Sequence, residues 1–238
     1  ILAPFLLFLA ACSTREPTSS PPDAICQDVT VALVDTCGAY ADINNGSNDP
    51  DGDLVGCVQE PPGPYDLGTT TVTLTCTDSE DNTDASTGTV TLTDSVVPTI
   101  ALTGAASETL ECKAGDTYND PGATAEDICE GPLTPVVSGT VNMGVPNTYT
   151  LSYDVEDSSG NSPEAVTRSV TVQDTLKPSL TLNGLPNEAL ECGSPYVDPG
   201  AVASDQCAGN LTAAIVKGGT VNNMEPGSYP VTYNVTDP

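Results

Sequence analysis

The sequence contains no histidine and no tryptophan, and only two of its 238 residues are phenylalanine. Histidine is the side chain that most often transfers protons near neutral pH, and it is the commonest metal ligand in proteins. Its absence excludes Ser-His-Asp and Cys-His catalysis and His-ligated zinc within these residues. Pairs of carboxylates remain available, but no other catalytic pattern stands out. We therefore predict that this stretch is not an enzyme.

Basic residues are also scarce. Lys and Arg total 5 against 33 Asp and Glu, which gives a net charge of −28 at pH 7. Such a negative field repels the phosphates of nucleic acids and the head groups of anionic lipids. We expect no nucleic-acid partner. The carboxylates suit an environment that contains divalent cations.

The N-terminus carries an apolar run from Ile1 to Ala11. A membrane-spanning helix needs about 20 apolar residues, so this run is too short to cross a bilayer. It is typical of the apolar core of a secretion signal, although the basic leader and the initiating Met are missing. We interpret residues 1–11 as a truncated signal peptide.

The four residues Leu9-Ala10-Ala11-Cys12 resemble the lipobox of bacterial lipoproteins. The resemblance implies that Cys12 is lipidated and becomes the mature N-terminus of an exported protein. Ser13 rather than Asp follows it, which favours anchoring in the outer membrane. Each buried methylene of an acyl chain contributes about 0.8 kcal/mol to such an anchor. The alternative is a buried cysteine on a short core helix.

The Ser/Pro-rich residues 12–24 predict an extended tether, because they offer little apolar area to bury. Beyond the tether, six motifs recur in one order at spacings of 78 to 80 residues, starting at Glu111 and Glu191. They are Glu-Cys, Asp-Pro-Gly-Ala, Asp-x-Cys, Leu-Thr, Gly-Thr-Val-Asn and Tyr-x-x-x-Tyr. With a more diverged first copy, they predict units at 25–94, 95–174 and 175–238. We expect the third unit to lack its last strand, and the chain to be cut at both ends.

Apolar and polar residues alternate within each unit. The stretch TTTVTLTC places Val72, Leu74 and Cys76 on one face and threonines on the other, and YTLSYDV and RSVTVQD alternate in the same way. This period of two, with Gly, Pro and Asp-Gly between the runs, is typical of half-buried strands. Several short strands in 70 to 80 residues predict an all-β fold of tandem antiparallel β-sandwiches.

The second and third units resemble the bacterial surface immunoglobulin-like (Ig-like) repeats, a family related to the Ig-like domain of a pesticidal crystal protein. In the second unit the matching residues are Asp120-Pro121-Gly122-Ala123, Asp127, Leu133-Thr134, Gly139-Thr140-Val141, Tyr149, Tyr153 and Asp157-Ser158-Ser159-Gly160-Asn161. The first unit is similar to a hyalin repeat through LGTTTVTLTCTDSEDN, although Asp81-Asn82 replaces the usual Gly-Asn. The resemblance implies Ig-like sandwiches in an extracellular setting and no particular ligand.

Nine cysteines are present, and Cys12 is the odd one. The others fall in even numbers per unit: Cys26, Cys37, Cys57 and Cys76 in the first, Cys112 and Cys129 in the second, and Cys192 and Cys207 in the third. An exported protein keeps such cysteines as disulfides. A cysteine-only zinc site is the weaker reading, because no Cys-x-x-Cys occurs.

The spacing suggests which cysteines pair. We predict Cys112–Cys129 and Cys192–Cys207, each closing a loop of about 15 residues worth roughly 3 kcal/mol. The first unit allows three connectivities, of which we favour Cys26–Cys76 with Cys37–Cys57.

Two groups of acids are candidate calcium ligands. The stretch NDPDGD sets Asp49, Asp51 and Asp53 at alternate positions, as in a calcium loop. Position six of that loop would be Leu54 rather than Gly, so an ordinary solvated turn is the alternative. At the unit junctions, Asp94 and Asp174 end a strand.

Asp78 or Asp157 could approach those junctions, where calcium would stiffen the array.

Three functional hypotheses follow. The first is a non-catalytic, lipid-anchored stalk at the cell surface, structural or adhesive, with a protein or carbohydrate as its ligand. The second is a spacer within a larger secreted enzyme. The third is a filament subunit, because an open sheet edge can accept a strand from a neighbour.

Overall fold

The computed structural model describes residues 19–238, so Cys12, residues 1–11 and the first part of the tether lie outside the described residues. The chain divides into two compact units, Ile1–Val96 and Val97–Pro238. Within the described part, regular structure is β-strand apart from one 3-10 turn at Thr212–Ala214. The predicted all-β fold is therefore confirmed. No helix among these residues has the length and apolar character that crossing a membrane requires.

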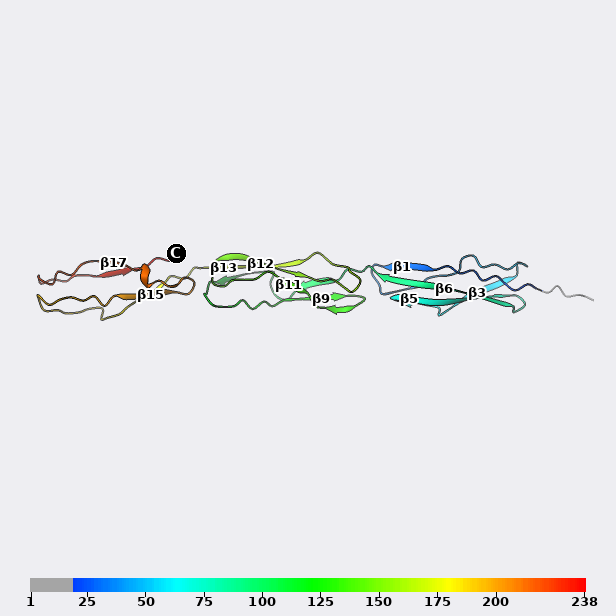
Figure 1. Cartoon of the computed structure of the whole chain (residues 1–238), viewed down its shortest axis with the longest axis horizontal. Coiled ribbons are helices and arrows are strands. Elements are labelled where there is room, and N and C mark those ends of the chain that lie inside the picture. The colour runs from blue at the N-terminus through cyan, green and yellow to red at the C-terminus, as the bar shows by residue number, and fades with distance from the viewer. Residues whose placement is uncertain (1–18) are drawn as a thin grey trace, which may run out of the picture. The chain divides into compact units, whose positions relative to one another are not determined.

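The first unit is built around one four-stranded sheet (Figure 1). Its strands are β1 (Val29–Leu33), β2 (Gly38–Ala39), β3 (Leu54–Glu60), β4 (Tyr65–Asp66), β5 (Gly68–Asp78) and β6 (Thr83–Asp94). The sheet has the order β1-β6-β5-β3, and β2 pairs with β4 separately. The long hairpin of β5 and β6 forms its centre, because the two strands pair from Gly68 to Thr77.

The core of the first unit lies on one face of this hairpin. Val72, Leu74 and Cys76 are at most 1% exposed, whereas the threonines between them reach solvent. The period of two read from the sequence is therefore confirmed. The other buried apolar residues of this cluster are Ala24, Leu33, Ile43, Tyr65, Val90 and Leu92.

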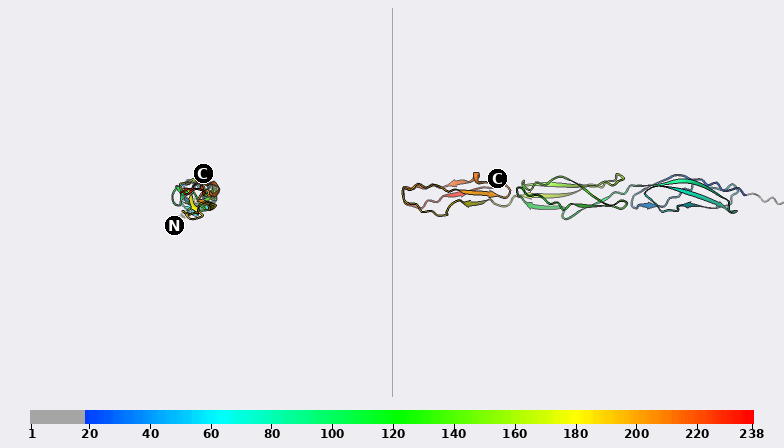
Figure 2. Two further views of the ribbon diagram at one scale, coloured as in Figure 1. Left: turned by 90° about the vertical axis from the view of Figure 1, so that its left-hand side faces the viewer. Right: turned by 60° about the horizontal axis from the view of Figure 1, so that its bottom comes forward.

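The second unit begins with a sandwich of two sheets (Figure 2). Its strands are β7 (Thr99–Leu102), β8 (Ser107–Glu111), β9 (Ala123–Asp127), β10 (Gly131–Leu133), β11 (Val136–Ser138), β12 (Asn147–Asp154) and β13 (Val166–Gln173). One sheet has the order β10-β9-β7 and the other β11-β12-β13-β8. Leu151 and Tyr153 of β12 and Val170 and Val172 of β13 point into the core.

One strand pair in each of these sandwiches is parallel rather than antiparallel. β1 runs parallel to β6, and β8 runs parallel to β13. An early strand of each sandwich thus lies beside the last one and runs in the same direction. Alternation in a sequence identifies the buried face of a strand but not the direction of its neighbour, so the antiparallel arrangement expected from the sequence does not extend to these two pairs.

The third sandwich follows within the same unit. Its strands are β14 (Ser179–Leu182), β15 (Ala201–Asp205), β16 (Gly209–Asn210), β17 (Val216–Gly218) and β18 (Thr232–Asn234). They form the sheets β14-β15-β16 and β17-β18. Residues 187–191, which repeat the sequence of β8, form no strand, and residues 175–238 contain no counterpart of β13.

The repeated Gly-Thr-Val motif needs its glycine for steric reasons. Gly139 and Gly219 have φ angles of 93° and 86°, a region that L-residues with side chains rarely adopt. A side chain at Gly139 would also collide with the carbonyl oxygen of Thr150, and one at Gly219 with that of Pro230. The motif therefore marks a close approach between neighbouring strands in both repeats.

Candidate functional site

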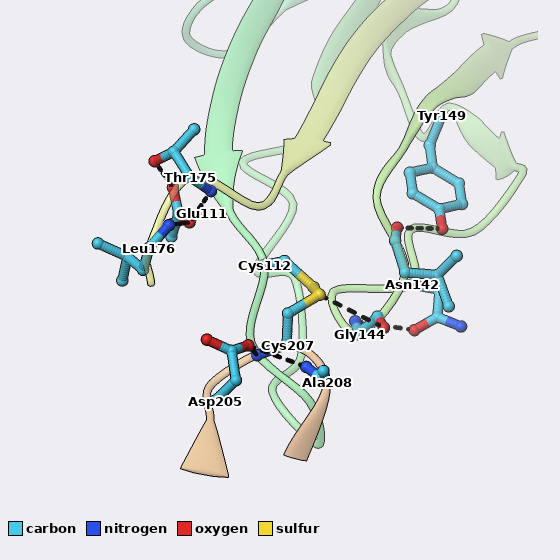
Figure 3. The surroundings of a disulfide bond; sticks show 11 residues. Glu111, Cys112, Asn142, Gly144, Tyr149, Thr175, Leu176, Asp205, Cys207 and Ala208 are labelled. Carbon is cyan, nitrogen blue, oxygen red and sulfur yellow. Dashed lines mark hydrogen bonds between the residues drawn. A yellow bond between two sulfur atoms is a disulfide. The ribbon is translucent and has the colours of Figure 1, made fainter. Parts of the chain in front are cut away.

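A disulfide joins the second sandwich to the third (Figure 3). Cys112, directly after β8, is bonded to Cys207, in the turn between β15 and β16. Their Cα atoms lie 5.1 Å apart, although the two residues are 95 positions apart in sequence. The two repeats are therefore covalently connected in two places, by the chain and by this bond.

Apolar and polar contacts surround the disulfide. Cys112 is fully buried, and the half-buried side chain of Cys207 packs against its cluster. The remaining members of that cluster are Met143, Val172, Leu110, Tyr118, Val141 and Tyr149. The backbone N–H of Ala114 donates to the carbonyl oxygen of Gln206 at 2.8 Å. The junction thus combines a covalent bond, buried apolar area and a backbone hydrogen bond.

Glu111 fixes the linker that leaves β13. Its carboxylate accepts hydrogen bonds from the backbone N–H and hydroxyl of Thr175 and from the N–H of Leu176, at 2.6, 2.8 and 3.2 Å (Figure 3). The bonds from Thr175 lower the pKa of Glu111 below its ordinary value. The ionised side chain therefore holds the first residues of the linker against the second sandwich.

The pairings Cys112–Cys129 and Cys192–Cys207 predicted from the sequence were wrong. Glu126, near Cys129, pairs with Thr99 of β7 at the start of the second sandwich. In contrast, the backbone N–H of Cys112 donates a hydrogen bond to the carbonyl oxygen of Gln173 at the end of this sandwich. The two cysteines thus lie at opposite ends of one sandwich. Loop length along the chain carries no information about which end of a sandwich a cysteine occupies.

The favoured pairing in the first unit was also wrong. Cys57 and Cys76 face each other on β3 and β5 and form a disulfide with a Cα–Cα distance of 4.0 Å. Their pairing is a consequence of strand register, which sequence spacing does not report.

The remaining four described cysteines divide into two groups. Cys37 and Cys129 are also disulfide-bonded, and neither has the partner that we assigned to it. Cys26, which is half-buried, and Cys192, which is exposed, are free thiols, so predicting disulfides for them was wrong.

The aspartate of each Asp-Pro-Gly-Ala motif anchors a tyrosine of the opposite sheet. The carboxylate of Asp120 accepts a hydrogen bond from the hydroxyl of Tyr153 at 2.6 Å. In the next repeat, the carboxylate of Asp198 accepts a hydrogen bond from the hydroxyl of Tyr233. It also forms an ion pair with Lys217 at 2.5 Å. Two motifs far apart in sequence therefore meet inside each sandwich and have a structural role.

We expect Asp198 to make the third sandwich acid-sensitive. Hydrogen bonds from Lys217 and Tyr233 lower its pKa from 3.8 to about 2. Because the folded pKa is the lower one, the stabilisation is complete above pH 3.8 and is lost as the pH falls towards 2. Circular dichroism during acid titration should therefore show a transition in this range that Asp198→Asn reduces. The control Asp116→Asn, in an exposed ion pair, should leave that transition unchanged.

The structure brings together part of the predicted calcium loop. One carboxylate oxygen each from Asp49, Asp53 and Asp78 lie within 4.8 Å of one another. Asp51 does not belong to this cluster; it is exposed, and its carboxylate accepts the N–H of Ser20 at 2.6 Å. Asp78, which we had expected at a unit junction, instead lies beside the loop of its own unit.

The other acids that we predicted as ligands have different surroundings. Asp157 is 6% exposed, and its carboxylate accepts hydrogen bonds from Ser159 and Asn161 of its own turn. One oxygen of Asp94 accepts the N–H of Val96.

Asp174 stands close to Asp205 and Asp237 at the boundary between the second and third sandwiches. Burial raises its pKa, and the charges of Asp237 and Asp205 raise it further.

The third sandwich also carries an open groove of about 900 Å³. Residues 187–191 form part of its lining, opposite the stretch that leads into β18. Its apolar and aromatic lining includes Leu182, Leu190, Tyr196, Tyr229, Val231 and Tyr233. In the second sandwich, β13 separates the equivalent segments, β8 and β12. The groove therefore has the position of a strand.

The folds and the covalent junction define a protein of tandem, disulfide-linked β-sandwiches. The family model described as "Bacterial surface protein, Ig-like domain" matches residues 100–172 and 180–238. These matches cover more than half of the chain, so the chain belongs to the family of bacterial surface proteins with Ig-like domains. That membership indicates a location at the bacterial cell surface.

Three of the solved structures that match the chain differ in how much of it each match covers. The lipoprotein BT2262 of Bacteroides thetaiotaomicron is 25% identical over 36% of this chain, with a TM-score of 0.29, and the match spans 44% of that protein. Extracellular domains 21–23 of human CDH23 are 15% identical over 85% of each chain, with a TM-score of 0.37. Cadherin domains 1–4 of protocadherin gamma B7 are 14% identical over 91% of this chain and 68% of theirs, with a TM-score of 0.33. No curated protein matches the sequence significantly.

Proposed function

We propose that the chain is a non-catalytic stalk of the bacterial surface, anchored in the outer membrane through a lipid on Cys12. The observation that carries this proposal is the disulfide between Cys112 and Cys207, because it makes two consecutive Ig-like sandwiches resist separation. A module that only had to fold would not need a covalent bond to its neighbour. A module that holds a binding surface away from a membrane benefits from a stiff junction.

The composition supports this proposal. A net charge of −28 keeps the modules soluble and disfavours nucleic acid as a partner, so we propose a protein or a carbohydrate as the ligand. We further propose that the first unit is a hyalin-type module and that the next two are of the pesticidal-crystal-protein type. If the modules instead space a catalytic domain in a larger secreted enzyme, the complete reading frame will contain that domain.

We expect Cys12→Ser to release the protein from the membrane. The experiment expresses the chain with a lipoprotein signal sequence in a bacterial host that processes lipoproteins, and it follows both palmitate labelling and membrane fractionation. The parent chain should carry label and sediment with outer membranes, whereas Cys12→Ser should carry none and stay in the soluble fraction. Cys192→Ser, which removes an exposed free thiol, is the control and should behave as the parent. Equal fractionation of all three would contradict the anchor.

A further inference from the structure

Three carboxylates converge near the start of the first sandwich, at the cluster of Asp49, Asp53 and Asp78. Asp49 and Asp53 flank the turn before β3, and Asp78 ends β5, the neighbouring strand. One oxygen from each lies within 4.8 Å of the others. Strand register therefore brings a distant acid against a short acidic loop.

Two oxygens of this cluster are buried without a partner. Oδ2 of Asp49 and Oδ1 of Asp53 are inaccessible to solvent and accept no hydrogen bond from the described residues. Their sister oxygens are satisfied, by the N–H groups of Asp51 and Gly52 and by the hydroxyl of Ser79. Buried polar atoms are nearly always paired, and buried charges are paired or coordinate a metal. The two unpartnered oxygens therefore point to a cation as their partner.

Hydrogen bonds fix the carboxylate of Asp78 in this position. It accepts them from the N–H groups of Glu80 and Asn82, from the side-chain amide of Asn82 and from the hydroxyl of Ser19. Asp78 itself is 1% exposed. The cluster thus includes one buried carboxylate that is held in place by its own turn.

Among the described residues of the first unit, no basic side chain is present to neutralise the cluster. Residues 19–96 contain fourteen Asp and Glu but no Lys, Arg or His. Without a protein cation, like charges at such distances repel one another. A cation from solution would supply the opposite charge that the described residues of this unit lack.

We propose that Asp49, Asp53 and Asp78 bind a calcium ion. All three ligands are hard oxygen donors, which disfavours zinc and copper, and calcium accepts six to eight oxygens in irregular geometry, with water completing the shell. Magnesium fits less well because it demands a regular octahedron and gives up its waters reluctantly. Extracellular calcium sites typically have dissociation constants of about 10⁻⁴ to 10⁻³ M.

The position of this site gives it a consequence beyond the proposed stalk. The hydroxyl of Ser19 donates to Oδ2 of Asp78 at 3.2 Å, and the N–H of Ser20 donates to Asp51. The end of the tether therefore lies directly on the acidic loop. Calcium binding fixes the point where the tether meets the first sandwich, so calcium sets the stiffness of the base of the stalk.

The experiment uses the full chain, freed of metal with a chelator and titrated with calcium chloride in a calorimeter. Asp53→Asn should lose one equivalent of bound calcium or bind it at least tenfold more weakly, and Asp49→Asn should do the same. Asp51→Asn is the matched control, because Asp51 lies in the same loop but outside the cluster, and it should bind as the parent does. Hydrogen exchange should show calcium-dependent protection of residues 49–54 and 76–82.

Thermal melting gives a second readout, because the difference in melting temperature between Asp53→Asn and the parent should change sign when calcium is added. In chelator, Asp53→Asn should melt above the parent, because one repelling charge is gone. In millimolar calcium the order should reverse, because only the parent keeps all three ligands. The proposal would be overturned if adding calcium left hydrogen exchange at residues 49–54 and 76–82 unchanged. Calcium-dependent protection found only around Asp174, Asp205 and Asp237 would overturn it as well. Equal calcium binding by Asp53→Asn, Asp49→Asn and Asp51→Asn would overturn it too.

Discussion

Replacing Arg168 by methionine should destabilise the second sandwich by about 3 kcal/mol, the lower end of the cost of breaking a buried ion pair, because Arg168 is buried while its partner Asp120 is partly exposed. Arg168 is 1% exposed and lies in the core between the two sheets. Its guanidinium donates to the carbonyl oxygens of Thr103 and Gly122, at 2.7 and 2.9 Å, and to the hydroxyl of Tyr153 at 3.2 Å. Methionine would remove all three hydrogen bonds and the interaction with Asp120, which lies 3.4 Å from the guanidinium.

Lys113→Met is the matched control for this variant. Lys113 also pairs with an aspartate, Asp116, at 3.1 Å, but both side chains are about half exposed. An exposed pair of this kind contributes about 0–1 kcal/mol. Urea unfolding followed by circular dichroism, with hydrogen exchange of β12 and β13 to assign the transition, measures both variants. Similar losses in the two variants would contradict the role assigned to Arg168.

Cys207→Ser should produce the other large loss of stability. The disulfide with Cys112 closes a loop of 95 residues, for which chain entropy predicts a contribution of about 4–5 kcal/mol as an upper value. The substitution also exposes the buried Cys112 thiol at the boundary of the two repeats. We expect the third sandwich to unfold at a lower temperature than the second, whereas the two should unfold together in the parent.

Cys192→Ser is the control for the disulfide variant, because Cys192 is a free and exposed thiol. It should leave the melting profile unchanged. Adding a reductant to the parent should likewise separate the transitions of the second and third sandwiches, and it also breaks the other disulfides, including Cys57–Cys76. If Cys192→Ser were as destabilising as Cys207→Ser, the pairing seen in the structure would be wrong.

The sequence alone was sufficient to predict the fold class and the buried face of the strands. Val72, Leu74 and Cys76 are buried as predicted, and so are Val170 and Val172. A period of two reports directly which side of a strand faces the core. The Ig-like motifs likewise pointed to the family that the comparison with known sequences supports.

The disulfides and the ion pair of Arg168 with Asp120 could not be predicted from the sequence. They depend on strand register and on which ends of the sandwiches meet. Cys57 meets Cys76 only because β3 and β5 pair in one register, and Cys112 meets Cys207 only because the sandwiches follow each other end to end. The sequence did contain one indication that Arg168 has a structural role. It occupies an inward position of β13, two residues before the buried Val170, where a charged side chain requires buried partners.

The candidate calcium site was predictable in part. The alternation of acids in NDPDGD pointed to Asp49 and Asp53, and both belong to the cluster. The same alternation included Asp51, whose carboxylate turns instead to the backbone of Ser20. Asp78 joins through the pairing of β3 with β5, a contact between residues far apart in sequence.

The account depends on the covalent junction between the second and third sandwiches, and disulfide mapping tests it most directly. The full chain is purified from an oxidising compartment, its free thiols are blocked, and it is digested at acidic residues without reduction before mass spectrometry. We predict a cross-linked peptide pair that contains Cys112 and Cys207, with Cys192 carrying the blocking group. Peptides that join Cys112 to Cys129 and Cys192 to Cys207 would contradict the account.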